Sequence, residues 1–273
     1  MSIAETEAEA AVAAPDHVRP GDLTVSDGVR IHYVEAGEGA PVVLLHGYTS
    51  SCDAGFFSDG LARELARTHR VIGIDARGHG RSEKPHDPAK YGGDRMPMDV
   101  LEVLDHLGVQ RAHFHGYSMG GMLVADLMAR APERFTSASF GGSGVRETDP
   151  ALAETAADKD PKGHDPQQDE ARAWLAARAD RDDEALRCVQ EGRRASPSTA
   201  PPLDLAKIEF PVQAINGEFD APVSKTQRLA REARDFEAVI LPGRGHNTIT
   251  NYPYTPRLYI DALASFVRAN DPA

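Results

Sequence analysis

The chain has only two cysteines, Cys52 and Cys188, among its 273 residues. Two thiols cannot build the disulfide framework of a small secreted domain, and no CxxC or Cys/His spacing that could hold zinc is present. We therefore interpret both as ordinary thiols and predict no metal site. Long apolar runs are also missing: no stretch approaches about 18 consecutive apolar residues. With no lipidation pattern at either end, neither a membrane span nor an anchor is predicted.

Basic charge is scarce relative to acidic charge. The chain has 30 Lys and Arg against 42 Asp and Glu, and its formal net charge is -12. Because phosphate binding needs clustered basic residues in excess, this balance argues against a nucleic-acid partner. Residues 1–20 are rich in Ala and Glu and lack the basic start and apolar run of a secretory signal. We expect this segment to be a disordered tail and the protein to be cytoplasmic.

The first half of the chain predicts an α/β sheet. With 41% hydrophobic residues, the chain can bury one large core. Two short β-type runs flank the turn sequence Ser26-Asp27-Gly28, which suits a hairpin. Four continuous apolar runs follow, separated by helical periodicity, and such runs are typical of parallel strands buried on both faces. These six runs lie at residues 23–25, 29–34, 41–47, 71–75, 112–116 and 135–142.

The second half contains an insertion. Residues 145–205 are charged, Pro-rich and poor in large aliphatic residues, so we expect no sheet strand there and interpret the segment as a cap. Strand patterns resume at 211–220 and 236–246. We predict one domain, residues 21–273, with a mostly parallel eight-stranded sheet. Helices are expected at about 94–107, 119–131, 223–234 and 254–269.

Ser118 lies in the sequence GYSMGG, between a predicted strand and a predicted helix. A GxSxG pattern needs this strand-turn-helix context, because the serine must sit at the apex of a tight, strained turn. Gly116 and Gly120 suit such a turn, since a side chain at either position would clash with the neighbouring strand or helix. A serine hydroxyl is a poor nucleophile by itself and needs a base within hydrogen-bond reach, together with an acid that orients the base.

Candidates for the base and the acid follow in chain order. His246 lies after the final strand, on the Gly-rich loop of LPGRGHN, and an imidazole can take up and return a proton at neutral pH. Asp220 ends the strand-like PVQAINGEFD, at the edge where parallel sheets place their ligands. Asp220 could instead cap the following helix, and Glu218 is a rival acid. His115 precedes the serine turn and is interpreted as structural.

Five motifs in the correct order identify a family resemblance. From about residue 22 onward the chain resembles the α/β-hydrolase superfamily, through HGYTS at 46–50, DARGHGRS at 75–82, GYSMGG at 116–121, GEFD at 217–220 and GRGH at 243–246. The resemblance implies an α/β-hydrolase fold, a triad of Ser118, His246 and Asp220, and no cofactor. It also implies an oxyanion hole formed by the backbone N–H groups of Met119 and Tyr48, with the Tyr48 ring lining the pocket.

By the same resemblance, a loop after the predicted strand at 71–75 braces the sheet edge by hydrogen bonds. Its residues are assigned a structural role rather than a catalytic one: Asp75, Arg77, His79 and Ser82. Neither a P-loop pattern nor paired ligand spacing indicates a phosphate or metal site in this loop.

Three functions remain open at this point. The first is hydrolysis of a carboxylic ester through an acyl-enzyme on Ser118. The second is hydrolysis of a carbon-carbon bond by the same triad, although members of that kind usually carry Trp after the catalytic histidine, where this chain has Asn247. The third is ligand perception with little turnover, as in hormone receptors that resemble this fold. Dehalogenases and epoxide hydrolases of similar sequence use an Asp nucleophile, so Ser118 argues against both.

We expect the insertion to determine substrate specificity, because caps cover the carboxyl edge of the sheet. A lipase lid would carry a broad apolar face, whereas this segment is dominated by Asp, Glu, Arg and Ala. We therefore predict a small or medium soluble substrate as the partner, and leave the oligomeric state open. Trp174 could line the substrate pocket, but a lone Trp in a polar insertion more often anchors its helix.

Overall fold

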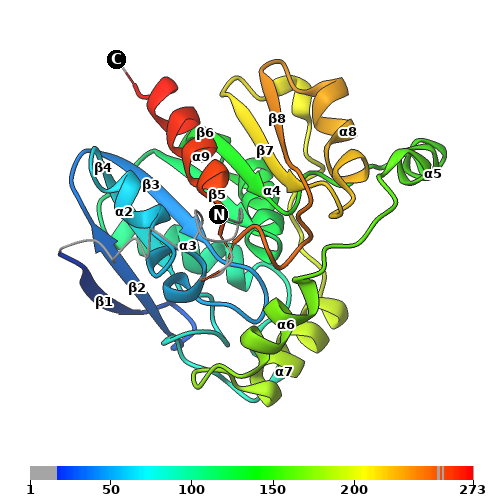
Figure 1. The fold of residues 1–273 in the computed structure, drawn as a ribbon. Helices are drawn as coiled ribbons and strands as arrows, with labels where there is room; N and C mark the ends of the chain where they lie inside the picture. The colour runs from blue at the N-terminus through cyan, green and yellow to red at the C-terminus, as the bar shows by residue number, and fades with distance from the viewer. Residues whose placement is uncertain (1–16, 251–252, 254, 273) are drawn as a thin grey trace, which may run out of the picture.

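Eight strands form one sheet in the computed structural model of the protein, which describes residues 17–250, 253 and 255–272 (Figure 1). Their order across the sheet is β1-β2-β4-β3-β5-β6-β7-β8. The pairs β1/β2 and β2/β4 are antiparallel, and the other neighbours are parallel, which confirms the predicted mostly parallel sheet. The strands are β1 (Arg19–Thr24), β2 (Arg30–Ala36), β3 (Ala40–Leu45), β4 (His69–Ile74), β5 (Ala112–Tyr117), β6 (Phe135–Gly141), β7 (Val212–Gly217) and β8 (Phe236–Leu241).

Helices cover both faces of the sheet, which explains why the central strands are apolar without alternation. On β3, Val43 and Leu45 join a core cluster with α3, α4 and α8, whereas Val42 and Leu44 join a second cluster with α2 and α9. The helices outside the cap are α2 (Leu61–Leu65), α3 (Arg95–His106), α4 (Met119–Arg130), α8 (Pro222–Glu232) and α9 (Arg257–Ala269), with the π-helix η1 (Asp53–Phe57) and the 3-10 turns η2 (Pro88–Lys90), η3 (Pro132–Arg134) and η4 (Leu205–Lys207).

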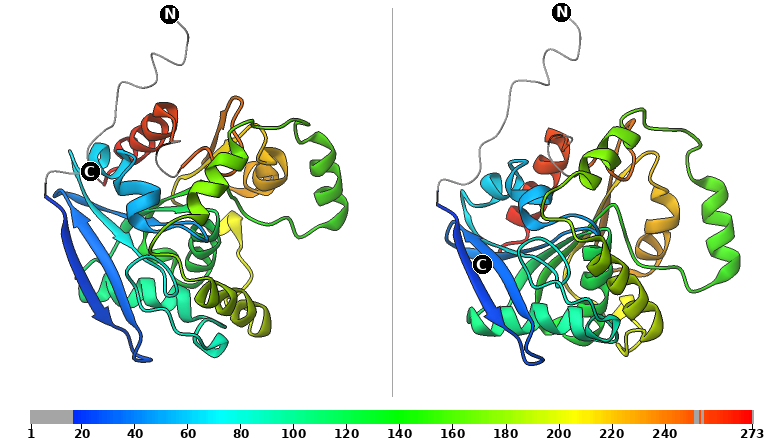
Figure 2. Two further views of the ribbon diagram at one scale, coloured as in Figure 1. Left: turned by 60° about the horizontal axis from the view of Figure 1, so that its bottom comes forward. Right: turned by 90° about the horizontal axis from the view of Figure 1, so that it is seen from below.

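The segment between β6 and β7 is helical. Residues 145–205, all of which the structure describes, contain α5 (Pro150–Lys159), α6 (Gln168–Ala176) and α7 (Asp183–Ala195) and no strand. Aspartates at the N-caps begin two of these helices: Asp149 accepts from the Ala151 N–H at 2.9 Å, and Asp182 from the Ala185 N–H at 2.9 Å. Figure 2 shows α5 standing out from the body, away from the other two cap helices.

The start of the sheet corrects one boundary. β1 begins at Arg19, so the last two residues of the tail expected at 1–20 belong to the sheet, where they pair with β2. Residues 1–16 of that expected tail lie outside the described residues. Both cysteines are buried and unpaired, and burial raises the pKa of the Cys52 thiol, which suits the interpretation as ordinary thiols. Within the described part of the chain, no helix has the length and apolar character needed to cross a membrane.

Candidate active site

The turn at Ser118 has the strained backbone that its sequence predicts. Ser118 joins β5 to α4 at φ 52° and ψ -107°, a conformation that costs a non-glycine residue free energy. A Cβ on Gly120 would lie 1.9 Å from the Leu45 carbonyl oxygen, and one on Gly116 would lie 2.3 Å from the Gly120 carbonyl oxygen. The two glycines therefore let α4 approach β3 and β5 closely enough to hold the serine at the strand end.

His246 and Asp220 lie beside this serine. His246 Nε2 is 2.9 Å from Ser118 Oγ, and its Nδ1 is 2.8 Å from Asp220 Oδ2. Asp220 is 8% exposed, so little water competes for its carboxylate, whereas the His246 side chain is 33% exposed and can meet an incoming molecule. The structure thus brings together three residues that are up to 128 positions apart in the sequence.

The two rival carboxylates, Glu218 and Asp220, have different partners in the structure. Glu218 Oε2 accepts a hydrogen bond from the Gly243 N–H at 2.8 Å, while Asp220 is the carboxylate that meets the imidazole. Asp220 is not the N-cap of α8 either. That position is occupied by Ala221 at φ 48°, which offers no side-chain oxygen to the helix.

Two contacts at the site were not found from the sequence. Lys225 Nζ donates to Asp220 Oδ1, the carboxylate oxygen that does not meet the imidazole. The Tyr117 hydroxyl donates to the His246 carbonyl oxygen, and burial raises the Tyr117 pKa well above its usual range, so this hydroxyl stays protonated. Lys225 lies in the first turns of α8, five residues after Asp220, and that spacing was the available signal.

Two backbone segments adjoin Ser118: the start of α4 and the loop that follows β3. Met119 is the first residue of α4, and the first N–H groups of a helix have no partner within the helix. Gly47 lies against the serine, since a Cβ on it would be 3.5 Å from Ser118 Cβ. His46 Nε2 accepts from the Ala76 N–H at 3.0 Å, which ties the loop before Tyr48 to the neighbouring strand end. An oxyanion hole formed by the N–H groups of Met119 and Tyr48 stays a prediction.

The predicted pocket residues have contacts with the cap. The Tyr48 ring packs edge-on against His79 with centroids 5.7 Å apart, and its hydroxyl donates to the Leu186 carbonyl oxygen at 2.9 Å. Trp174 on α6 is half-buried, and the Arg178 guanidinium lies 5.7 Å from its ring centroid. A role in binding substrate stays a prediction for both aromatic residues.

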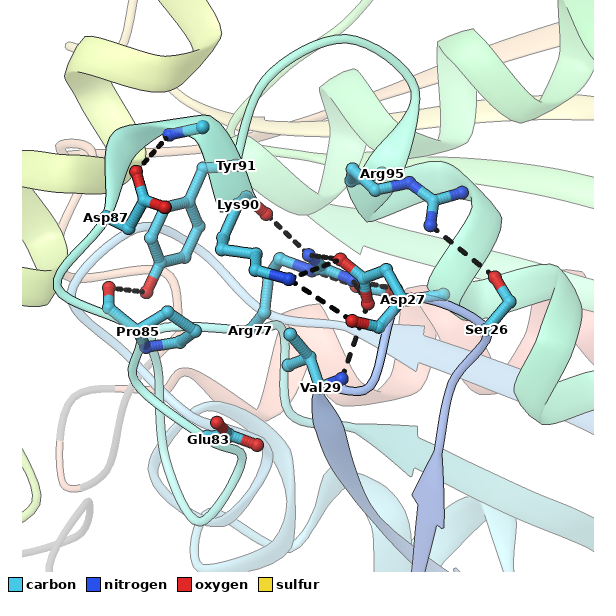
Figure 3. A network of polar contacts seen from close by, with 12 residues as sticks. Ser26, Asp27, Val29, Arg77, Glu83, Pro85, Asp87, Lys90, Tyr91 and Arg95 are labelled. Atoms are coloured by element: carbon cyan, nitrogen blue, oxygen red, sulfur yellow. Dashed lines mark hydrogen bonds and ion pairs between the residues drawn. The ribbon is translucent and has the colours of Figure 1, made fainter.

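The loop after β4 braces the sheet edge. Asp75 accepts from the backbone N–H groups of Cys52 and Arg81, both at 2.8 Å. Arg77 is fully buried, and its guanidinium donates to Asp99 at 2.7 Å and to Asp27 at 2.9 Å. Figure 3 shows Arg77 beside Asp27 and Lys90. Asp75 and Arg77 are thus engaged with protein groups, which suits the predicted structural role of these two residues.

One cluster of possible metal ligands lies at the opposite edge of the sheet. His69, His113 and Asp271 each bring a ligand atom within 4.8 Å of the others. Ordinary hydrogen bonds explain much of this arrangement: His69 Nε2 is 3.0 Å from Asp271, and the Nδ1 atoms of His69 and His113 are each 2.8 Å from the Thr68 and Ser137 hydroxyls, respectively. The sequence spacing of these residues gave no signal for the cluster.

Comparisons with known proteins place this geometry in a family. The sequence pattern of the family described as "alpha/beta hydrolase fold" matches residues 40–194, more than half of the chain. The chain belongs to the α/β-hydrolase fold family, in which a serine nucleophile is typical.

Relatives within the family have different names. The chain is 38% identical over 116 residues to a putative non-heme haloperoxidase of Mycobacterium phage D29, covering 42% of this chain and 40% of the relative. It is 38% identical over 123 residues to 2-hydroxymuconate semialdehyde hydrolase of Pseudomonas putida, covering 45% and 43%. The chain thus aligns with less than half the length of either relative.

A solved structure is similar along nearly its whole length. It is described as "Est816 as an N-Acyl homoserine lactone degrading enzyme", is 26% identical, and has a TM-score of 0.64 over 91% of this chain and 99% of that one. The names of these three proteins describe different reactions. Similarity therefore supports an enzyme of the hydrolase family, but it does not identify the reaction, which has to be argued from the geometry of the site.

Proposed function

We propose that this chain is a serine hydrolase that cleaves a carboxylic ester of a small or medium soluble substrate. The observation that carries the proposal is the continuous chain of hydrogen bonds from Ser118 through His246 to Asp220, at 2.9 and 2.8 Å, on a strained turn. Both distances lie within the range in which a base can take a proton from its nucleophile.

The proposed reaction has two halves. Ser118 Oγ attacks the ester carbonyl carbon while its proton passes to His246 Nε2, and Asp220 stabilises the imidazolium through Nδ1–H. The N–H groups of Met119 and Tyr48 receive the negative oxygen. The imidazolium then gives its proton to the departing alcohol, which leaves an acyl-enzyme. Water, deprotonated by His246, attacks that acyl group and releases the acid and the free serine.

The proposed size and solubility of the substrate rest on the cap. On α5 the buried residue is Ala156, and on α6 the buried residues are Ala171 and Leu175. Neither of these two helices therefore has a broad apolar face. Leu152, at 37% exposure, is the large apolar side chain that α5 shows to solvent. A surface of this kind does not favour adsorption to lipid droplets.

The named relatives suggest which ester chemistry to compare. A lactone is a cyclic ester, so the solved relative described as a lactone-degrading enzyme is compatible with this proposal. Carbon-carbon hydrolysis is the second candidate, favoured by the relative named 2-hydroxymuconate semialdehyde hydrolase. Against this second candidate, hydrolases of that kind usually carry Trp after the base, where this chain has Asn247. The Asn247 backbone N–H donates to Gln168 Oε1 at 3.0 Å.

The deciding experiment is turnover of p-nitrophenyl esters of graded acyl length by the wild type and by Ser118→Ala. The proposal requires turnover that is lost in the variant, together with labelling of Ser118 by a fluorophosphonate. Equal inactivity of both proteins on every ester and lactone would contradict it. Ring-fission dienones would then test the carbon-carbon reaction, and tight binding of an ester without turnover would indicate a receptor.

A further inference from the structure

A nine-residue segment of the cap, residues 160–168, runs past both loops that carry the proposed acid and base. It links α5 to α6, and we call it the strap. Asp160 Oδ1 accepts from the backbone N–H groups of Val223 and Ser224 at 2.7 and 3.2 Å. Because Ala221 offers no capping side chain, Asp160 supplies the N-terminal cap of α8, the helix that follows Asp220.

Next along the strap, Gly163 lies against the residue before the acid. A Cβ on Gly163 would be only 2.1 Å from the Phe219 ring, so the strap backbone packs directly on that side chain. The Phe219 N–H in turn donates to the Arg244 carbonyl oxygen at 2.9 Å, which joins the acid loop to the base loop. The strap therefore contacts the point where these two loops meet.

Asp165 holds the loop of the base. It is 3% exposed, and its Oδ2 accepts from the Gly245 N–H at 2.8 Å and from the Thr248 hydroxyl. Burial raises the Asp165 pKa, but the hydrogen bonds from Thr248, Gln167 and Gly245 outweigh it, so the pKa lies below its usual value. The carboxylate is thus ionised at neutral pH and is a strong acceptor for both loop groups.

Two glutamines add contacts to residues before and after the base. Gln168 Oε1 accepts from the Asn247 N–H at 3.0 Å, and Gln167 Oε1 accepts from Arg244 Nη1 at 2.9 Å. Residues immediately before and after His246 are therefore bonded to the strap. The core side of the loop is held separately, by the Tyr117 hydroxyl on the His246 carbonyl oxygen.

We propose that the strap positions the catalytic base, with Asp165 and Gln168 as positioning residues that hold His246 Nε2 within proton-transfer distance of Ser118. The inference rests on the proposed function. The base loop contains two glycines before the histidine, one of them, Gly243, at φ 68°, so its own backbone does little to fix the imidazole. A misplacement of about 1 Å can cost about 10²-fold in rate.

This arrangement gives the cap a role besides covering substrate. A segment that only covers substrate would affect KM when its side chains are shortened. A segment that only stabilises the fold would lower the unfolding midpoint and leave the folded molecules fully active. A positioning segment lowers kcat of the folded protein, because the transition state of proton transfer depends on the imidazole position while ground-state binding does not.

The experiment compares four variants with the wild type on p-nitrophenyl acetate: Asp165→Ala, Asp165→Asn, Gln168→Ala and the matched control Asp169→Ala. The Asp169 side chain is 82% exposed and, among the residues that the structure describes, forms an ion pair with Arg172 at 3.5 Å. We expect kcat to fall about 10- to 100-fold in Asp165→Ala, with KM within about threefold. Asp165→Asn retains one acceptor oxygen and should recover part of the loss, Gln168→Ala should lose about threefold to tenfold, and the control should match the wild type.

A spectroscopic readout separates position from stability. The low-field proton NMR signal of His246 Nδ1–H, assigned by its loss in His246→Gln, should broaden or shift in Asp165→Ala at temperatures where urea unfolding shows the variant to be folded. Unchanged kcat and an unchanged signal in folded Asp165→Ala would overturn the proposal, as would an equal loss in the control. If Asp165→Ala does not fold, Gln168→Ala decides in the same way, because it removes only the part-buried hydrogen bond to the Asn247 N–H.

The two proposals fail differently. Retained ester turnover in Ser118→Ala would contradict the proposed function and, with it, the reaction that the strap is proposed to serve. Turnover that depends on Ser118 but is unaffected by Asp165 and Gln168 would contradict the strap alone.

Discussion

Replacing Asp220 by Asn tests whether this carboxylate acts as the acid that orients His246. Asp220 Oδ2 is 2.8 Å from His246 Nδ1, and the residue is 8% exposed. An Asn has the same shape, but it carries no charge to stabilise the imidazolium. If its amide N–H faces Nδ1, the imidazole must keep its proton on Nε2, which then cannot accept the proton of Ser118.

The expected loss follows from that switch of tautomer. In a serine-histidine-aspartate site, the corresponding change lowers kcat by about 10⁴-fold, and at about 1.4 kcal/mol for each factor of ten this is about 5 kcal/mol of transition-state stabilisation. Because Asp220 is almost excluded from solvent, water cannot take the place of its carboxylate. The loss should therefore lie at the large end of what a single triad residue can cause.

A second effect must be separated from the first. Asp220 also binds Lys225, so Asp220→Asn leaves this ammonium without its ion pair. The double variant Asp220→Asn/Lys225→Met removes the stranded charge and should be as slow as the single variant, although more stable toward urea. The matched control Glu218→Gln changes the rival carboxylate, whose partner is the Gly243 N–H, and should keep kcat within about threefold.

The assay is steady-state hydrolysis of p-nitrophenyl acetate, with urea unfolding of each variant as the test of folding. The reasoning would be refuted if Asp220→Asn kept more than a tenth of the wild-type kcat. It would also be refuted if Glu218→Gln lost as much activity as Asp220→Asn, because Glu218 would then be acting as the acid.

Three further predictions concern the framework of the site. Arg77→Met should lower the free energy of unfolding by about 3–5 kcal/mol, because it leaves the buried Asp99 unpaired and also removes a partner of Asp27. Urea denaturation of Arg77→Met/Asp99→Leu should show part of this stability restored, and no recovery would contradict the assignment. Gly120→Ala should lower turnover about 10²-fold, since its Cβ would lie 1.9 Å from the Leu45 carbonyl oxygen; wild-type kinetics would disprove the clash. Burial lowers the His115 pKa from 6.5 to about 3, so the unfolded chain takes up the proton first and stability is lost as pH falls from about 6.5 toward 3. His115→Gln removes this titration, so between pH 6 and pH 4 its free energy of unfolding should fall by about 1.4 kcal/mol less per pH unit than that of the wild type. Urea unfolding measures both, and the same pH dependence in the two proteins would refute the prediction.

The sequence by itself determined the parts of this protein that depend on neighbouring residues. Continuous apolar runs predict parallel strands because both faces of each strand are covered, and Val42 to Leu45 on β3 show this alternation between two cores. The turn at Ser118 could be predicted because strand, glycines and helix adjoin one another in the chain. The order of Ser118, Asp220 and His246 followed from their places after successive strands.

Tertiary structure decided what depends on approach between distant segments. Asp220 and Glu218 are two residues apart and carry the same group, so only the paths of the loops after β7 and β8 could assign one to His246 and the other to Gly243. Asp165 was missed for the same reason, whereas Lys225 is only five residues from its partner Asp220 and was missed although the spacing was a signal. Asp165 lies 80 positions before the Gly245 N–H that it binds, in an insertion whose polar composition indicates a cap but carries no periodicity that would reveal its partners. Local chemistry thus predicted the turn that carries Ser118, while only the folded chain determined which side chains contact Asp220 and the loop of His246.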